Sequence, residues 1–238
     1  MQLLVSVSDA DEARAAVDGG AGIIDAKNPS IGALGAVRPD VLSAIRGTVD
    51  SSHLVTAALG DADAANSVEE LARELVARGA RLVKVGFAGV ADPGRVEEII
   101  KRLAHACAWA NATSGVVAVA YADAEAGGCI DAHELLAPAA RSGASGVLVD
   151  TADKRGPGLL DLWSVLTLES WIAEAHAHGL MAAVAGKLGL DDLAAVADTG
   201  ADVAGVRGAA CVGGRAGRVS SERVRALVEK VALQRSTT

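Results

Sequence analysis

Short apolar runs alternate along the chain with longer segments in which apolar residues recur every three or four positions. The apolar runs predict strands at 2–7, 22–24, 53–59, 81–87, 114–124, 145–151, 180–186 and 202–208. The segments after them predict helices at 9–20, 38–46, 68–80, 91–110, 135–142, 168–178, 191–201 and 220–233. Near-continuous apolar strands, each followed by a helix, are typical of a parallel sheet that is covered on both faces.

Eight such strand–helix units fill the 238 residues and predict an α/β protein with a single TIM-barrel domain, (β/α)8, over residues 1–238. A doubly wound open sheet is the alternative, but it would use about five or six strands and leave residues over. No linker or charge block marks a domain boundary. The most irregular stretch, 152–163, is expected to fold over the site.

Composition and charge exclude several classes of partner. The net charge of -8 argues against nucleic acid, because affinity for nucleic acid rests on neutralising phosphates with basic residues. No apolar run reaches the roughly 18 residues of a membrane span, and no basic segment of a signal peptide follows Met1, so we expect a cytoplasmic protein without a membrane partner. Three widely spaced cysteines without a CxxC predict reduced thiols and no structural zinc site. The oligomeric state stays open, a homo-oligomer included.

Charged residues interrupt the apolar pattern where the strands end. Asp25 and Lys27 share one side of the second strand, because side chains in a strand alternate, and Asn28-Pro29 then turns the chain. Lys84 lies between valines that are expected to face the helices, so its side chain should point into the barrel near Lys27. Other charges follow strands three, five and six, at Asp61, Asp123, Asp150 and Lys154. In a barrel these strand ends form one mouth, where active sites of this fold lie.

Lysines that lie close together lower one another's pKa, which leaves a neutral amine that can attack a carbonyl and form an imine. A second lysine or an aspartate can then move protons at the adjacent carbon. Lys27, Lys84, Asp150 and Lys154, with Asp25, are therefore the candidate catalytic residues. Structural ion pairs remain the alternative interpretation of these charges.

The last two predicted strands end in glycine turns, where this fold often binds phosphate through backbone N–H groups. The candidate phosphate-binding residues are Gly186, Arg207, Gly208 and Ala209. The histidines show no metal-ligand spacing, so neither a metal nor another cofactor is expected.

Five motifs together resemble those of the (5-formylfuran-3-yl)methyl phosphate synthase family, which makes 4-hydroxymethyl-2-furancarboxaldehyde phosphate. They are DAKNPSIGALGA at 25–36, LVKVGF at 82–87, AYADA at 120–124, VDTADK at 149–154 and GVRGAACVGG at 205–214. The resemblance implies a TIM-barrel lyase that joins two molecules of glyceraldehyde 3-phosphate into a furan precursor of methanofuran. It also implies that Lys27 forms the Schiff base and Lys84 accepts the proton, with Asp150 and Lys154 in the site.

The chain departs from the family pattern at Ala26, Ala58 and Lys187, where valine, threonine and serine are expected, and it lacks an aspartate after Gly214. Two other functions fit the same residues. Another class I aldolase or a sugar-phosphate isomerase would use the same lysines on a different substrate. A non-catalytic sugar-phosphate-binding barrel would keep the glycine turns without needing both Lys27 and Lys84.

Overall fold

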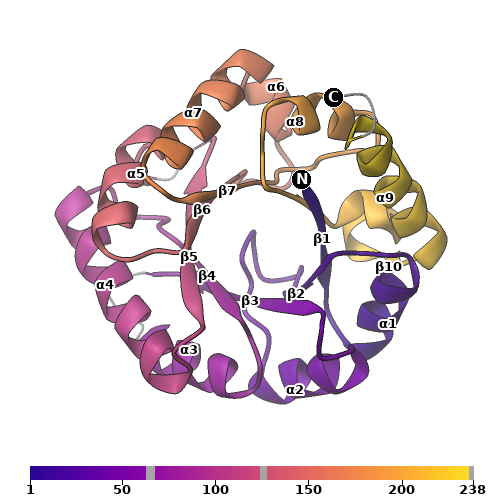
Figure 1. Ribbon diagram of the computed structural model, residues 1–238, viewed down its shortest axis with the longest axis horizontal. Coiled ribbons are helices and arrows are strands. Elements are labelled where there is room, and N and C mark those ends of the chain that lie inside the picture. Colours follow the sequence, from indigo (N-terminus) through magenta and orange to yellow (C-terminus); the bar gives the residue numbers. More distant parts are fainter. Residues whose placement is uncertain (63–67, 124–127, 236–238) are drawn as a thin grey trace.

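Eight parallel strands close into a barrel, in which β8 pairs with β1 (Figure 1). The computed structural model describes residues 1–62, 68–123 and 128–235. The strands are β1 Gln2–Val7, β2 Ile23–Ala26, β3 Leu54–Asp61, β4 Leu82–Gly86, β5 Gly115–Tyr121, β6 Gly146–Asp150, β7 Met181–Val184 and β8 Val203–Val206. The predicted TIM barrel is thus confirmed, and the open sheet is wrong. Ala124, the last residue of the predicted fifth strand, lies outside the described residues.

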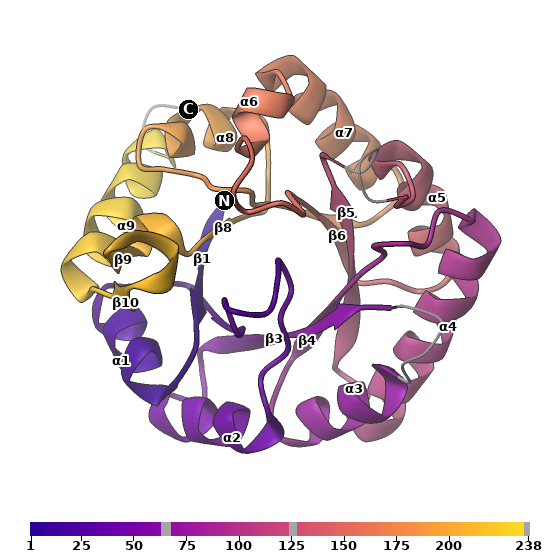
Figure 2. The same cartoon turned by 180° about the vertical axis from the view of Figure 1, so that it is seen from behind.

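Helices surround the barrel as an outer ring, seen from the other side in Figure 2. They are α1 Ala10–Asp18, α2 Pro39–Thr48, α3 Val68–Ala77, α4 Pro93–Ala110, α5 Ala132–Arg141, α6 Leu159–Leu162, α7 Val165–Ala177, α8 Asp192–Asp198 and α9 Ser221–Arg235. No helix in the described part of the chain is long and apolar enough to cross a membrane.

Three helical segments differ from the prediction. Helix α7 begins at Val165, three residues before the predicted start, because the Ser164 side chain accepts a hydrogen bond from the N–H of Thr167. Helix α5 begins at Ala132, three residues before the predicted start, because the Asp131 side chain accepts hydrogen bonds from the N–H groups of His133 and Glu134 and so caps an earlier turn. The stretch 152–163, expected to be irregular, contains the short helix α6. There Gly158 N–H donates to the Asp161 side chain at 2.7 Å, which closes the first turn.

The alternation of side chains along each strand separates two apolar layers. Residues such as Val5, Ile24 and Val83 point outward and pack against the helices. Their neighbours in sequence point inward, where Leu4 and Leu148 belong to a second, interior cluster. The inward side of β1 to β4 changes from apolar to polar toward the carboxyl ends of the strands, which is where the predicted site residues lie.

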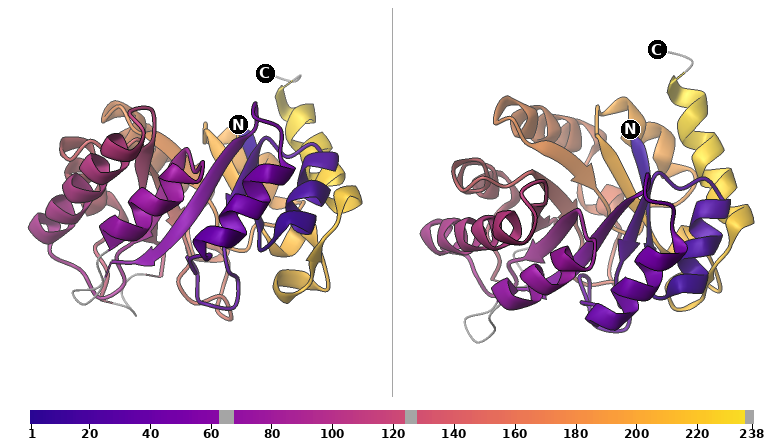
Figure 3. Two further views of the ribbon diagram at one scale, coloured as in Figure 1. Left: turned by 90° about the horizontal axis from the view of Figure 1, so that it is seen from below. Right: turned by 60° about the horizontal axis from the view of Figure 1, so that its bottom comes forward.

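The segment between β8 and α9 folds into a structure that the sequence did not predict. A 3-10 helix at Gly208–Ala210 leads into the two-stranded hairpin of β9, Cys211–Val212, and β10, Arg218–Val219. A second 3-10 helix, Gly214–Ala216, lies between the two short strands. Figure 3 shows in side view that this segment and the loop after β2 project from the same side of the barrel.

We predict that Gly86→Ala destabilises the barrel by about 2–3 kcal/mol, because a methyl group there has no room. The Tyr121 hydroxyl donates to Asp61 Oδ1 at 2.7 Å beside Gly86, and an added Cβ would overlap both of those oxygen atoms. Urea unfolding measures the loss. Gly47→Ala is the control: its Cβ would meet nothing within 4 Å, so it should leave stability unchanged or raise it by up to about 1 kcal/mol. Equal midpoints for the two variants would refute this account of Gly86.

Candidate active site

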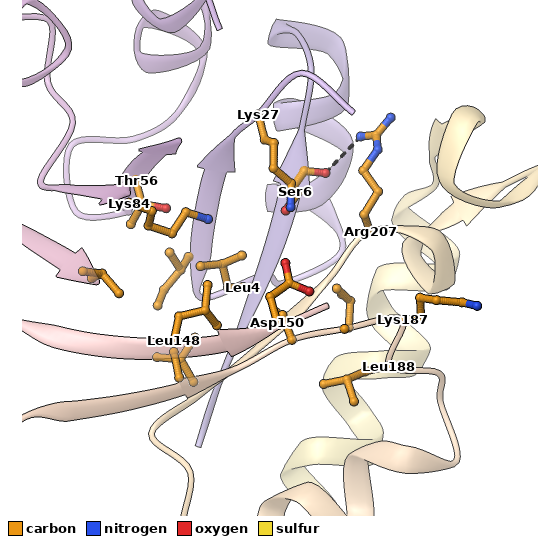
Figure 4. A pocket seen from close by; sticks show the side chains of 18 of the residues that line it. Leu4, Ser6, Lys27, Thr56, Lys84, Leu148, Asp150, Lys187, Leu188 and Arg207 are labelled. Carbon is orange, nitrogen blue, oxygen red and sulfur yellow. Dashed lines mark hydrogen bonds between the residues drawn. The ribbon is translucent and has the colours of Figure 1, made fainter. Parts of the chain in front are cut away.

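A cavity of about 390 Å³ lies at the barrel mouth and extends into the barrel interior. Its deeper wall is apolar and includes Leu4 and Leu148, both labelled in Figure 4. Of the predicted site residues, the cavity is lined by Lys27, Lys84, Asp150, Lys154, Gly186, Arg207, Gly208 and Ala209. Asp25 is fully buried behind this lining and contacts Lys84. The structure therefore brings together residues that the sequence placed on strands two, four, six, seven and eight.

The Asp25 carboxylate is the acceptor for three neighbouring side chains. Oδ2 lies 2.5 Å from Lys84 Nζ and accepts from Ser6 Oγ at 2.9 Å, while Oδ1 accepts from Thr56 Oγ1 at 2.8 Å. The strand register causes this arrangement, because Asp25 lies between Ser6 on β1 and Thr56 on β3. The ion pair and the two hydrogen bonds from hydroxyl groups together compensate the free-energy cost of burying the Asp25 and Lys84 charges. Ser6 and Thr56 were not among the predicted site residues, since single hydroxyl residues in apolar strands carry little signal.

Lys27 has no such partner. Within the described residues its amine makes no ion pair or hydrogen bond, although the side chain is only 6% exposed. Burial is the main cause that lowers its pKa from 10.5 to about 8; the positive charge of Lys84 lowers it further, and Asp150 and Asp25 oppose the shift. Figure 4 shows Lys27 pointing into the cavity. A substantial fraction of this amine is therefore neutral near pH 8 and can act as a nucleophile.

Asp150 and Lys154 form a second pair in the cavity. Lys154 Nζ lies 2.5 Å from Asp150 Oδ1 and 3.3 Å from Thr151 Oγ1. Burial raises the pKa of Asp150, but the charges of Lys154 and Lys27 outweigh that effect, so the pKa lies below its ordinary value. Asp150 is thus an ionised carboxylate on the opposite side of the cavity from Asp25, in position to exchange protons with a molecule bound at Lys27.

Arg207 is enclosed by protein acceptors. Nη1 donates to Ser6 O at 3.0 Å, the bond dashed in Figure 4, and to Glu12 Oε2 at 2.6 Å. Nη2 donates to Glu12 Oε1 and Gly217 O, and Nε donates to Arg215 O, each at 3.1–3.2 Å. A guanidinium has five N–H groups, so a direct bond from Arg207 to a phosphate would require one of these bonds to break.

The turns after β7 and β8 differ in what they offer a ligand. Gly208 and Ala209 have backbone N–H groups with no acceptor among the described residues. Gly186 has a positive φ of 117°, and its carbonyl accepts from Leu159 N at 2.8 Å, which fastens this turn to the loop after β6. The phosphate assignment for these residues stays a prediction.

Two cations in the cavity wall were missed by the sequence analysis as site residues. Lys187 follows Gly186 with a φ of 58°, and its amine donates to Gly156 O at 2.5 Å. Figure 4 shows this side chain directed away from Asp150. Arg215 is half-buried between the two strands of the hairpin and reaches the loop after β2. Its position depends on the unpredicted hairpin, so no pattern in the strands could have indicated it.

Two other carboxylates at strand ends do not line the cavity. Asp61 accepts hydrogen bonds from Tyr121 Oη and from Ala88 N. Asp123 accepts from the N–H groups of Ala152 and Asp153 at 2.7 and 2.9 Å and so shapes the loop after β6. Both residues stabilise loops around the mouth.

The sequence profile of a family described as 4-HFC-P synthase matches residues 3–228. Proteins similar to this chain include the (5-formylfuran-3-yl)methyl phosphate synthase of Methanothermobacter thermautotrophicus, with 38% identity over 96% of this chain and 98% of that protein. The enzyme of the same name from Methanobrevibacter smithii is 39% identical over 90% of this chain and 91% of its own length. That from Methanocaldococcus jannaschii is 38% identical over 96% and 99%.

Solved structures with a similar fold act on other compounds. Phosphoribosyl anthranilate isomerase from Thermus thermophilus aligns with 98% of this chain and 99% of its own, at a TM-score of 0.63 and 14% identity. A 3-hexulose-6-phosphate synthase aligns with 95% of this chain and 99% of its own, at a TM-score of 0.62 and 23% identity. At such identities the likeness shows the TIM-barrel fold alone.

We predict that Lys27→Met raises the free energy of unfolding at pH 7 by up to about 3 kcal/mol, because it removes a buried amine. The folded pKa of about 8 lies below the ordinary value of 10.5, so between these pH values the unfolded chain binds more protons. Raising the pH through this window therefore stabilises the native chain, and the advantage of the variant should shrink and vanish near pH 10.5.

Urea unfolding at pH 7 and pH 10 measures this effect, with Lys101→Met as control because Lys101 is exposed on α4. A gain of equal size at both pH values would contradict the predicted titration of Lys27.

We predict that Arg207→Met costs about 3–5 kcal/mol of stability, because the buried Glu12 loses its hydrogen-bonded cation and keeps only Arg218, 3.8 Å away. Burial raises the pKa of Glu12, and the bonds from Arg207 outweigh it and keep that pKa low. Arg14→Met is the control: Arg14 lies on α1, as Glu12 does, but pairs with Asp11 at the surface, so its loss should cost no more than about 1 kcal/mol. Similar losses in chemical denaturation for both variants would show that the buried pair has no special importance.

Proposed function

The chain belongs to the 4-HFC-P synthase family, and we propose that it joins two molecules of glyceraldehyde 3-phosphate into (5-formylfuran-3-yl)methyl phosphate through an imine on Lys27. Its relatives carry that enzyme name, and the product is the furan precursor in methanofuran biosynthesis. The observation that supports the imine is the contrast among the buried lysines. Lys84 and Lys154 each contact a carboxylate at 2.5 Å, whereas Lys27 contacts no carboxylate in the described part of the chain and has a pKa of about 8.

The first step is attack of Lys27 Nζ on the aldehyde carbon of one molecule, with loss of water to give the imine. The protonated imine acidifies the hydrogen on the adjacent carbon, and we assign removal of that proton to Lys84, whose own proton can pass to Asp25 at 2.5 Å. The resulting enamine expels the phosphate of its own molecule and leaves an enol next to the imine. The carbon that carried this phosphate then attacks the carbonyl carbon of the second molecule, which has first isomerised to its ketone form, and forms the new carbon–carbon bond. This order gives each of the two lysines a different task.

Ring formation follows by elimination. By atom balance, two molecules of glyceraldehyde 3-phosphate that form a furan with one retained phosphate release inorganic phosphate and two waters. These losses need an acid for each leaving oxygen and a base for each proton, and the Asp150–Lys154 pair lies in the cavity to supply both.

The phosphate that is retained needs a binding site near the mouth. We assign it to the turns after β7 and β8, where the N–H groups of Gly208 and Ala209 have no acceptor among the described residues and Gly186 lines the cavity. Arg207 contributes by fixing the segment after β8 through its bonds to Arg215 O and Gly217 O. We also assign the enzyme to the cytoplasm, where its three free cysteines would stay reduced.

Lys27→Arg and Lys84→Arg should separate the two lysine roles. The guanidinium of Lys27→Arg does not deprotonate near neutral pH, so borohydride with glyceraldehyde 3-phosphate should leave no covalent adduct on that variant. Lys84→Arg should still trap the imine, while furan formation falls by about 10²-fold or more, the size of a lost general base. Peptide mass spectrometry reads the adduct, and ultraviolet absorbance reads the furan.

Native protein without borohydride is the blank, and Lys101→Arg is the control for a general effect of the substitution. Trapping on Lys27→Arg but not on Lys84→Arg would exchange the two roles. Normal trapping by both variants would refute an imine at either lysine.

A further inference from the structure

The cations in the cavity wall divide into paired and unpaired groups. Lys84, Lys154 and Arg207 contact Asp25, Asp150 and Glu12 respectively. Lys27, Lys187 and Arg215 form no ion pair within the described residues. Lys27 is the proposed nucleophile, and the Lys187 side chain is exposed and directed away from the centre. In the part of the chain that the structure describes, Arg215 is therefore the half-buried cation of the cavity wall that has no counterion.

The contacts of Arg215 leave part of its guanidinium free. Nη2 donates to Gly32 O at 2.8 Å and to Pro29 O at 3.4 Å, both in the loop that follows Lys27. Nε and Nη1 have no acceptor among the described residues. Burial lowers the pKa of Arg215, and the nearby Asp150 opposes that shift, which places the guanidinium within electrostatic reach of the catalytic centre. An incoming anion would supply the counterion that this buried charge lacks.

The backbone places Arg215 beside the proposed phosphate turn. A Cβ built on Gly208 would lie 3.6 Å from the backbone nitrogen of Arg215, so the two stretches are in contact. Arg207 Nε donates to the Arg215 carbonyl at 3.1 Å, which holds Arg215 at the cavity while the Arg207 guanidinium stays fully bonded to protein. The free N–H groups of Gly208 and Ala209 and the free side of the Arg215 guanidinium thus border the same part of the cavity.

We propose that Arg215 is the cation that binds a phosphate of the substrate, and that it connects this phosphate to the loop after β2. The guanidinium would keep its bond to Gly32 O and donate from Nε and Nη1 to phosphate oxygens. Binding of the phosphate would thereby hold the loop that follows Lys27 in place. This inference rests on the proposed function for the identity of the substrate, but the anion site itself can be measured without any reaction.

The test compares Arg215→Met and Arg215→Lys with the native chain. Glycerol 3-phosphate is the probe, because it has the phosphate of the substrate and no aldehyde, so it cannot form an imine. Titration calorimetry should show affinity about 10- to 100-fold weaker for Arg215→Met, the range for losing a charged hydrogen-bond donor, with part of it restored in Arg215→Lys. The control is Arg155→Met, which removes a 95% exposed cation from the loop after β6 and should bind as the native chain does.

A second measurement separates phosphate binding from a purely structural role. Borohydride trapping of glyceraldehyde 3-phosphate at low concentration should slow in Arg215→Met by a factor similar to the loss of affinity, while trapping of unphosphorylated glyceraldehyde should stay within about twofold of native. Equal slowing with both aldehydes would show that Arg215 acts only on the loop, and unchanged affinity for glycerol 3-phosphate would also overturn the proposal. If the native chain trapped no aldehyde, the proposed imine on Lys27 would be refuted. The calorimetric test of Arg215 would still hold, because it does not depend on an imine.

Discussion

The structure depends on how it compensates charges that are buried inside an apolar barrel. Burying an isolated ion in such surroundings costs several kcal/mol. Each buried cation must therefore pair with a carboxylate, lose its proton or bind an anionic ligand. Lys84 pairs with the Asp25 carboxylate, whereas burial lowers the pKa of Lys27 to about 8, so its amine loses the proton more readily than an exposed lysine does. The same physical constraint therefore produces a buried ion pair and an amine with a lowered pKa from two residues of one type.

Shape supports this electrostatic arrangement. The interior of the barrel is lined by aliphatic side chains such as Leu4 and Leu148, which exclude water from below and desolvate the amines above them. Above the lysines, the loops are joined by bonds between charged side chains and backbone carbonyls. Lys187 connects the loops after β7 and β6, and Arg215 connects the segment after β8 to the loop after β2. The mouth is therefore a set of connected loops above the apolar interior of the barrel.

Members of other enzyme families share this barrel at low identity, so the fold alone does not select the reaction. The feature that distinguishes the site of this chain is the arrangement of its carboxylates. Asp25 and Asp150 lie on opposite sides of the cavity, and each forms an ion pair with one lysine. Lys27 contacts neither carboxylate, although both negative charges act to raise its pKa. Under the proposed function, Lys27 would be the nucleophile and these two pairs would exchange protons with the substrate.

The sequence by itself determined the barrel and the inward direction of Lys27 and Lys84, because both follow from local patterns: the order of strands and helices and the alternation along each strand. Only the tertiary structure decided which lysine is paired and which is free. The bonds from Arg207 to Glu12 and from Arg215 to Gly32 join residues 195 and 183 positions apart. Such contacts exist only once the last strand closes against the first, so no local pattern could encode them.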